Sequence, residues 1–457
     1  MLSTMTIAAT VSQVRPIIEA QREQIFADLK EITGFNSVHS TPELATSHHA
    51  AAEWVRRSFS ELGLTVTAYA EDSGSPVFIC TKPAVNNAPT VLLYSHYDVV
   101  PAGELSNWES DPFTLTERDG RWYARGAADC KGNLVMHLAA LRAVAELGGS
   151  DLGIKVVVEG SEEQGGAQLD ELIKTQPELF DADVIFIADS GNIAVGVPTL
   201  TTSLRGVTDI EVRVDTLKAP AHSGAFGGAA PDATAALIRL LDTFKDEHGR
   251  TVIDGIDCTG TWHGSSYDRE TFRRDAGMLD GVAIMGTEED DPFDMLLARP
   301  AISITGFSST PVEQAVNAVP PTAAAHLNVR VPAGQDAHEV AQAIVNQLHN
   351  RAPWGVKVST TIIETSQPFS TDTEGAGIKH FTQCLSQAYG NNEVVITGTG
   401  GSIPMCSVLS QAVPGAELTL FGVEEPQSTI HSPNESVDPN EIRDIAIAEA
   451  AFLLSYR

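Results

Sequence analysis

The sequence predicts an α/β fold in which helices cover a mostly parallel central sheet, with a second, α+β domain inserted into the chain. Three short apolar runs rich in β-branched residues support the first part: TVLLYSH (90–96), IKVVVEG (154–160) and DVIFIAD (183–189). Amphipathic segments such as NLVMHLAALRAVAEL (133–147) separate these runs. Apolar strands that alternate with helices are typical of a parallel sheet covered on both faces.

The region before the first strand is expected to be helical. Apolar residues recur at helical spacing across residues 16–32 and predict one helix there. A second helix is expected to start at Thr41–Pro42 and to stop near Gly63, because proline suits the first turn of a helix and glycine suits its end.

The pattern changes after about residue 198, where the inserted α+β domain is expected to begin. Its predicted strands and helices are TDIEVRVD (208–215), DATAALIRLLDTF (232–244), AISITGF (301–307), AAAHLNVRV (323–331), a helix over 337–350 and VKVSTTII (356–363). This order indicates an antiparallel sheet with helices packed against it. From about residue 366 the α/β pattern resumes and ends in the helix IRDIAIAEAAFLLSY (442–456). The domains are therefore predicted as 1–198 with 366–457, and 199–365.

The composition of the chain argues against some classes of binding partner and indicates a cellular compartment. A chain of 457 residues exceeds what one hydrophobic core usually supports, which agrees with two domains. The net charge of −31 repels phosphate backbones and anionic lipids, so we expect no nucleic acid and no membrane partner. The N-terminus lacks a signal-peptide pattern, and the scattered cysteines lack CxxC spacing, so a reducing, cytoplasmic location is expected. The cysteines are Cys80, Cys130, Cys258, Cys384 and Cys406.

Each apolar run of the first domain ends in side chains that can bind divalent metals. His96 and Asp98 end the first run, Glu162 and Glu163 follow the second, and Asp189 ends the third. Because ligands gather at the carboxyl ends of the strands in open α/β sheets, these side chains are expected to converge.

Two further candidates are Asp129, just before a predicted helix, and His431, near the C-terminus. Taken singly, each candidate has an ordinary interpretation as a strand-end residue, a helix cap or a loop residue. Burying so many carboxylates at one sheet edge would be costly without cations, so the set as a whole indicates a metal site.

These residues lie in motifs that resemble the M20 metallopeptidases, which include carnosinase-type dipeptidases, aminoacylases, carboxypeptidases and succinyl-diaminopimelate desuccinylase. The resemblance spans nearly the whole chain. Its motifs, in the family's order, are SHYDVVPAG (95–103), WESDPF (108–113), DGRWYARGAADCKGN (119–133), VEGSEEQGG (158–166), APAHSGAFGG (219–228), NAVPP (317–321), NVRVP (328–332), GTGGSIPM (398–405) and IHSPNE (430–435).

The resemblance implies a zinc-peptidase-like domain holding two divalent cations, zinc by expectation, with manganese or cobalt compatible. It implies that His96 and Asp189 hold one cation, that Glu163 and His431 hold the other, and that Asp129 bridges them. Two such cations can share a hydroxide and clamp the reacting carbonyl. Asp98 is expected to accept the second ring N–H of His96 and so fix its tautomer. Glu162 is expected to act as the general base.

The resemblance also assigns substrate contacts. The inserted domain is expected to act as a lid and to mediate a homodimer, with His222 donating a hydrogen bond to the developing oxyanion in the neighbouring subunit. Arg330, assisted by Asn317, is expected to hold a substrate carboxylate. The loop of Gly400, Gly401 and Ser402 precedes a helix and is expected to contribute backbone amides. Without the resemblance, His222 and Arg330 would be read as a loop residue and a strand-end surface residue.

Cys130 stands where family members often carry a second acid, and a packed, inert thiol is the expectation for it. Because the family often uses a cis peptide at this point, the Asp129–Cys130 bond is expected to be cis.

The predicted activity is hydrolysis of the amide bond of a small, carboxylate-bearing substrate, a dipeptide by first preference. An N-acyl-amino-acid hydrolase of the aminoacylase or desuccinylase type would use the same chemistry and remains an alternative. A metal-stabilised binding protein without catalysis is disfavoured, because Glu162 and all five ligand positions are present.

Overall fold

The computed structural model describes residues 6–70, 74–401 and 403–457. The chain divides into two compact units, the first formed by 1–202, 371–397 and 404–457 and the second by 203–370 and 398–403. No helix in the described ranges combines the length and the apolar character needed to cross a membrane.

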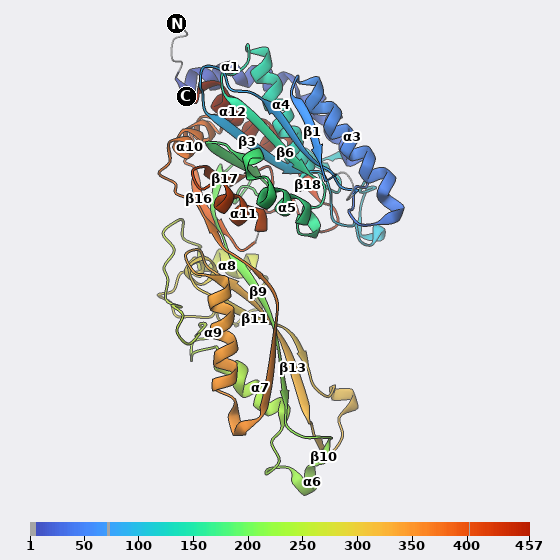
Figure 1. The fold of residues 1–457 in the computed structure, drawn as a ribbon, viewed down its shortest axis with the longest axis vertical. Helices are drawn as coiled ribbons and strands as arrows, with labels where there is room; N and C mark the ends of the chain where they lie inside the picture. The colour runs from blue at the N-terminus through green and yellow to red at the C-terminus, as the bar shows by residue number, and fades with distance from the viewer. Residues whose placement is uncertain (1–5, 71–73, 402) are drawn as a thin grey trace. The chain divides into compact units, whose positions relative to one another are not determined.

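The first unit is built on a twisted central sheet whose middle strands run parallel (Figure 1). Parallel pairing joins β6 to β3, β3 to β7 and β7 to β17, while the pairs that flank this centre are antiparallel. The predicted parallel α/β sheet is therefore confirmed. Across the sheet the order is β1 (Thr65–Tyr69), β2 (Val77–Lys82), β6 (Gly153–Glu159), β3 (Thr90–His96), β7 (Val184–Ala188), β17 (Glu417–Phe421) and β8 (Thr199–Leu204).

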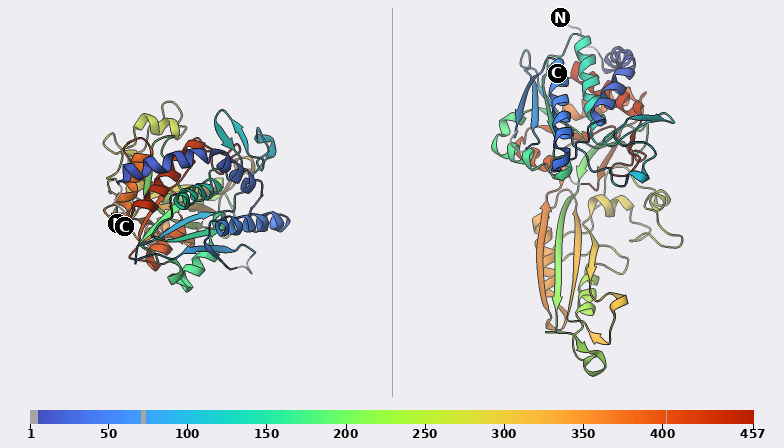
Figure 2. Two further views of the ribbon diagram at one scale, coloured as in Figure 1. Left: turned by 90° about the horizontal axis from the view of Figure 1, so that it is seen from above. Right: turned by 90° about the vertical axis from the view of Figure 1, so that its right-hand side faces the viewer.

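Helices cover both faces of this sheet (Figure 2). On one face, α4 packs against β3 and against the closing helix α12, and nearly every residue of both helices is buried. On the other face, α5 packs against α11. The helices of this unit are α1 (Ile7–Ala20), α2 (Arg22–Thr33), α3 (Ala45–Glu61), α4 (Lys131–Glu146), α5 (Ala167–Thr175), α10 (Ala376–Ala388), α11 (Pro404–Ala412) and α12 (Pro439–Ser455).

The single helix predicted over 16–32 is wrong, because two helices meet at Gln21. The backbone N–H of Gln21 bonds to the carbonyl of Ile18, a tighter turn that ends α1 before α2 begins. The first helix also starts at Ile7, well before the predicted limit at residue 16, and it contains Pro16. The second predicted helix is confirmed as a short 3₁₀ turn, Pro42–Leu44, that leads into α3.

The second unit is an antiparallel sheet with helices on one face, as predicted. Its order is β11 (Ala301–Ser308), β13 (Thr322–Val331), β9 (Gly206–Asp215) and β14 (Lys357–Ser366). Residues of β9 and β13 alternate between buried and more exposed, and their buried faces pack against α7 (Ala233–Asp242) and α9 (Ala337–Asn350). A short ladder of β10 (Ala221–His222) with β12 (Ala318–Val319) lies at one end of the unit (Figure 1).

A small sheet of the first unit carries two of the candidate loops. It consists of β4 (Thr116–Arg118), β5 (Arg121–Tyr123) and β18 (Ser436–Val437), all paired antiparallel. The loop that contains Asp129 leaves from β5, and the loop that contains His431 enters β18. Pairing of β5 with β18 thus brings together two segments that are more than 300 residues apart in the sequence.

Candidate metal centre

Three of the candidate ligand positions lie at the carboxyl ends of neighbouring parallel strands. His96 is the last residue of β3, and Asp189 directly follows β7. Glu162 and Glu163 lie in a 3₁₀ turn, Glu162–Gln164, just after β6. Since β6, β3 and β7 are parallel neighbours, these side chains meet at one edge of the sheet.

Asp129 stands between two histidines and presents one carboxylate oxygen to each. Its Oδ1 lies 3.0 Å from Nε2 of His96, and its Oδ2 lies 2.9 Å from Nε2 of His431. Each histidine also faces a second carboxylate: His96 Nε2 is 3.3 Å from Asp189 Oδ1, and His431 Nε2 is 3.1 Å from Glu163 Oε2. The five side chains thus form two groups that share Asp129.

These separations fit ligands that converge on a divalent cation. Bonds of about 2.0–2.2 Å in tetrahedral geometry place ligand atoms roughly 3.3–3.6 Å apart, slightly more than the 2.9–3.3 Å distances within the two groups. Oε1 of Glu163 is buried and has no hydrogen-bond partner among the described residues. Imidazole nitrogens and carboxylate oxygens are donors that suit zinc and similar ions.

The pKa values of several side chains in the cluster are raised, because acids are buried close together at this edge of the sheet. Burial, with help from the charge of Asp189, raises the pKa of Glu162 to about 9. Burial likewise raises the pKa of Glu163 and of Asp189. Hydrogen bonds to Asp129 and Glu163 raise the pKa of His431 to about 10. Without cations the cluster therefore retains protons, whose positive charge offsets the repulsion between carboxylates.

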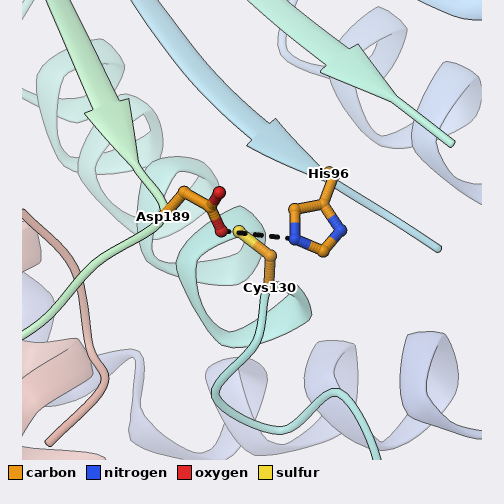
Figure 3. A group of neighbouring side chains, drawn as sticks. All are labelled: His96, Cys130 and Asp189. Atoms are coloured by element: carbon orange, nitrogen blue, oxygen red, sulfur yellow. Dashed lines mark ion pairs between the residues drawn. The ribbon is translucent and has the colours of Figure 1, made fainter. Parts of the chain in front are cut away.

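Cys130 lies beside His96 and Asp189, at the start of α4 (Figure 3). Its thiol is buried and donates a hydrogen bond to the carbonyl oxygen of Ala188, with Sγ 2.9 Å from that oxygen. Burial raises the pKa of this thiol well above its ordinary value, which favours the neutral form. The Asp129–Cys130 peptide bond is cis, which confirms the prediction from the sequence.

Asp98 has two structural roles beside the cluster. Nδ1 of His96 faces it, 3.2 Å from the backbone carbonyl oxygen and 3.3 Å from carboxylate Oδ1. The same carboxylate accepts the backbone N–H of Glu162 at Oδ1 and that of Glu163 at Oδ2, each at 3.1 Å. Asp98 therefore orients the imidazole so that Nε2 points to the cluster, and it also fixes the turn that carries the two glutamates.

Glu435, which the sequence did not single out, anchors the loop of Asp129. Its buried carboxylate accepts the backbone N–H groups of Gly126, Ala128 and Asp129 and pairs with Arg125 at 2.6 Å. A carboxylate four residues beyond His431 thus ties the His431 segment to the Asp129 loop. Glu435 ends the motif IHSPNE (430–435), but the sequence alone gave this glutamate no role of its own.

Glu424 is a second acid that the sequence reasoning missed. It follows β17, the fourth strand of the parallel group, and its carboxylate approaches Asp129 and Asp189 so that ligand atoms of all three lie within 4.8 Å of one another. Its Oε1 is buried without a hydrogen-bond partner among the described residues, and burial raises its pKa well above the ordinary value. The sequence contains a signal for this residue, because the apolar run AELTLFG (416–422) is also followed by acidic residues.

The predicted substrate contacts fall in the second unit and form two separate groups. His222 in β10 and Asn317 beside β12 are exposed neighbours, since the backbone N–H of Ser223 donates to the carbonyl of Asn317. Arg330 lies at the opposite end of β13 from Asn317. Ten strand residues span roughly 30 Å, so within one chain Asn317 and Arg330 cannot hold the same small ligand.

The glycine loop precedes α11, as expected from the sequence. Gly400 is partly buried and Gly401 exposed, and they lie between β16 (Val395–Thr399) and α11. Ser402, the third predicted contact of this loop, lies outside the described residues.

Comparisons with known proteins agree with this site. Residues 92–455 match the family model of peptidase family M20/M25/M40. A cysteinylglycine-S-conjugate dipeptidase of Corynebacterium striatum is 56% identical over 436 residues, covering 95% of this chain and 96% of the relative.

Two solved structures share the fold. Human carnosine dipeptidase 1 matches with a TM-score of 0.76 at 23% identity, over 98% of this chain and 99% of that one. The YXEP protein of Bacillus subtilis, a dinuclear metal-binding peptidase of family M20, matches with a TM-score of 0.61 at 12% identity, over 96% and 100% of the two chains. With the matched family model and the cluster at the sheet edge, the chain belongs to peptidase family M20/M25/M40 and is a metal-dependent hydrolase of the M20 type.

Proposed function

We propose that this protein is a two-metal dipeptidase that cleaves small dipeptides ending in a free carboxylate. The observation that carries the proposal is the position of Asp129, whose two oxygens each face a different histidine. In this proposal His96 and Asp189 hold one cation, Glu163 and His431 hold the other, and Asp129 binds both. Zinc suits the mixed imidazole and carboxylate donors, and manganese and cobalt are compatible with them.

These residues would hold cations whose chemistry is to polarise the amide carbonyl and to lower the pKa of a water molecule, so that the water loses a proton and can attack as hydroxide. Glu162 is the proposed base: it takes a proton from the attacking water and passes it to the leaving amine. Its Oε2 lies 3.9 Å from Nε2 of His96, while its neighbour Glu163 contacts His431. Asp98 keeps the two glutamates in these separate positions through their backbone N–H groups.

The relative at 56% identity supports a substrate class. Its name refers to S-conjugates of cysteinylglycine, so we propose dipeptides with cysteine or an S-substituted cysteine before glycine. Arg330 is the proposed contact for the terminal carboxylate, because guanidinium and carboxylate pair through two parallel hydrogen bonds. The backbone of Gly400, Gly401 and Ser402 is proposed to add donors to the same carboxylate.

We further propose a homodimer in which His222 and Asn317 serve the active site of the partner subunit. This is supported by their distance from Arg330 along β13. Apolar side chains on the edge strands β11 and β14 are also exposed, including Ile304, Phe307 and Ile363, and a second copy would cover them.

A complementation experiment tests the shared site. Coexpressed His222→Ala and Glu162→Gln chains, each inactive alone, should form mixed dimers in which one of the two sites is intact. Because about half of the dimers are mixed and half of their sites are complete, about a quarter of wild-type activity should return. Activity that stays at the level of the single variants would contradict the exchange of His222.

A cytoplasmic location is part of the proposal, supported by the five cysteines, all of which are free. Fractionation of cells with an antibody to the protein tests it.

The substrate proposal is tested with metal-stripped protein to which zinc, manganese or cobalt is added singly. We expect hydrolysis of Cys-Gly and S-methyl-Cys-Gly, with weaker cleavage of β-Ala-His and none of N-acetylglycine. Preferential cleavage of N-acetylated substrates would replace the dipeptidase with an N-acyl-amino-acid hydrolase. Calorimetric titration of the stripped protein should give two cations for each chain, and a single bound cation would contradict the two-metal site.

A further inference from the structure

Three acids lie wholly or partly buried in the segment between β17 and β18, and two of them hold that segment in place. Glu425 pairs with Arg121, and Glu435 pairs with Arg125 at 2.6 Å. Oε1 of Glu424 is also buried, but no described residue shares a hydrogen bond with it. Because a buried carboxylate oxygen without a partner is costly, a partner that the polypeptide does not supply is expected there.

The backbone of Glu424 is held beside the segment that carries Asp189. β17 pairs with β7 in parallel up to Phe421, which is opposite Ala188. The same register continues past the strand ends, because Glu424 forms a parallel bridge with Gly191. The position of Glu424 is therefore fixed by the sheet.

Glycine at position 191 permits this close approach. A Cβ there would overlap the carbonyl oxygen of Glu424 and lie 2.6 Å from its Cβ. The backbone N–H of Asn192 donates to the same carbonyl oxygen at 2.8 Å. Asp189 precedes Gly191 by two residues, and residues two apart on an extended segment point to the same face. The side chain of Glu424 can therefore reach back along the face that carries Asp189.

The carboxylate of Glu424 does approach the candidate metal centre. Its ligand atom and those of Asp129 and Asp189 all lie within 4.8 Å of one another. Asp129 and Asp189 also face Nε2 of His96, at 3.0 Å and 3.3 Å. We propose that Glu424 is a further ligand of the cation at His96. This cation then has four protein ligands, whereas the cation at His431 has three. The inference rests on the proposed two-metal site and deepens it.

The proposed ligands make the two cation positions unequal. The position at His96 offers one imidazole and three carboxylates, and the position at His431 offers one imidazole and two carboxylates. Carboxylate oxygens suit manganese, and each additional charged donor strengthens the attraction for a cation. We therefore expect the position at His96 to fill first and to hold manganese more tightly than the other position does.

Calorimetric titration of metal-stripped protein with manganese and with zinc tests the ligand through three substitutions of Glu424. Glu424→Leu removes the donor and the charge with little change in size. It should lower the manganese affinity of the tighter position about 10- to 100-fold. The zinc affinity should fall less, because zinc also accepts three protein ligands.

The other two substitutions separate a ligand from a nearby charge. Glu424→Gln keeps an oxygen donor and should retain part of the affinity. Glu424→Asp keeps the charge but draws the oxygens back by one methylene, so it should lose affinity. Glu393→Gln, a change of an exposed acid just before β16, is the control and should titrate like wild type.

Two results would overturn the proposal. One is wild-type affinity in Glu424→Asp together with equal losses in Glu424→Gln and Glu424→Leu, because only the charge would then matter. The other is unchanged affinity in Glu424→Leu. Thermal melting of each stripped protein verifies that it is folded, and if Glu424→Leu does not fold, the comparison of Glu424→Asp with Glu424→Gln decides.

Glu163→Gln identifies the cation that Glu424 serves. It weakens the group at His431, so the loss caused by Glu424→Leu should persist in the double variant. Disappearance of that loss would assign Glu424 to the other cation and overturn the proposal. A single cation bound to the wild type would contradict the two-metal site, but the Glu424 variants compared at that cation would still decide whether Glu424 is a ligand.

Discussion

The carboxylate of Asp98 accepts the backbone N–H of Glu163 at 3.1 Å, so a residue from the end of β3 fixes the turn after β6. Replacement of Asp98 by Asn keeps the size but removes one acceptor oxygen and the charge. We expect metal affinity to fall about 10- to 100-fold, as is usual when a partner of a metal ligand is lost. Competition with a chelating dye measures this affinity. Asp119→Asn, an exposed change in the β4–β5 turn, is the matched control, and equal affinities in both variants would contradict the role of Asp98.

The adjacent residues Glu162 and Glu163 should respond to the same substitution in different ways. Glu162→Gln should lower kcat at least about 100-fold, because a general base contributes 10²–10⁴ in rate, while the metal content stays normal. Glu163→Gln should lose metal, because its Oε2 belongs to the His431 group. Elemental analysis beside steady-state kinetics separates the two effects. Undiminished hydrolysis in Glu162→Gln would refute its assignment as the base.

Glu424→Gln should have opposite effects on the metal-free and the metal-loaded protein. The buried carboxyl lies near those of Asp129 and Asp189. Gln therefore removes the cost of keeping this acid protonated when no cation is bound, and it removes an attractive charge when a cation is bound. We expect the melting temperature of the stripped protein to rise and the metal affinity to fall. Scanning calorimetry with and without zinc measures both. A fall in melting temperature in both states would mean that Glu424 acts through packing alone.

Glu159 should make stability depend on pH. It is fully buried at the end of β6 and accepts a hydrogen bond from the hydroxyl of Tyr94 at 2.7 Å, and burial raises its pKa to about 8. Between its ordinary value of 4.5 and about 8, the folded state therefore holds a proton that the unfolded state has lost. Stability from this group is complete below about pH 4.5 and is lost as the pH rises through about 8, by up to about 1.4 kcal/mol per pH unit.

Glu159→Gln removes this proton linkage while keeping an acceptor for Tyr94. Urea unfolding of both proteins from pH 5 to pH 8.5 should show the wild type losing stability relative to the variant as the pH rises. Parallel pH profiles would show that Glu159 is ionised in the folded protein at all these pH values.

The parts of the site that could be predicted are those fixed by strand ends. His96, Glu163 and Asp189 meet because β3, β6 and β7 are parallel, and apolar runs identify such strands well. The helix α9 and the strand β3 have the residue limits that their sequence patterns indicated. Glu424 obeys the same rule, but its strand lies beyond the insertion and its acid comes three residues after the strand, so the pattern was less apparent.

Other features depend on the path of the chain in space. Asn317 and Arg330 are 13 residues apart, and only the extended β13 between them shows that they cannot share one ligand. The roles of His222, Arg330 and the glycine loop in binding stay predictions.

The position of β17 in the sheet affects the order in which the parts of the metal centre are assembled during synthesis. This strand lies between β7 and β8, although it is made long after both, and His431 follows it. During synthesis from the N-terminus, the growing chain holds His96, Asp129, Glu163 and Asp189 while the middle of its sheet still lacks a strand. The second imidazole, that of His431, arrives only after β17 has been made. A ribosome-bound chain that stops short of β17 therefore carries an acidic, incomplete centre that lacks one of its two histidines.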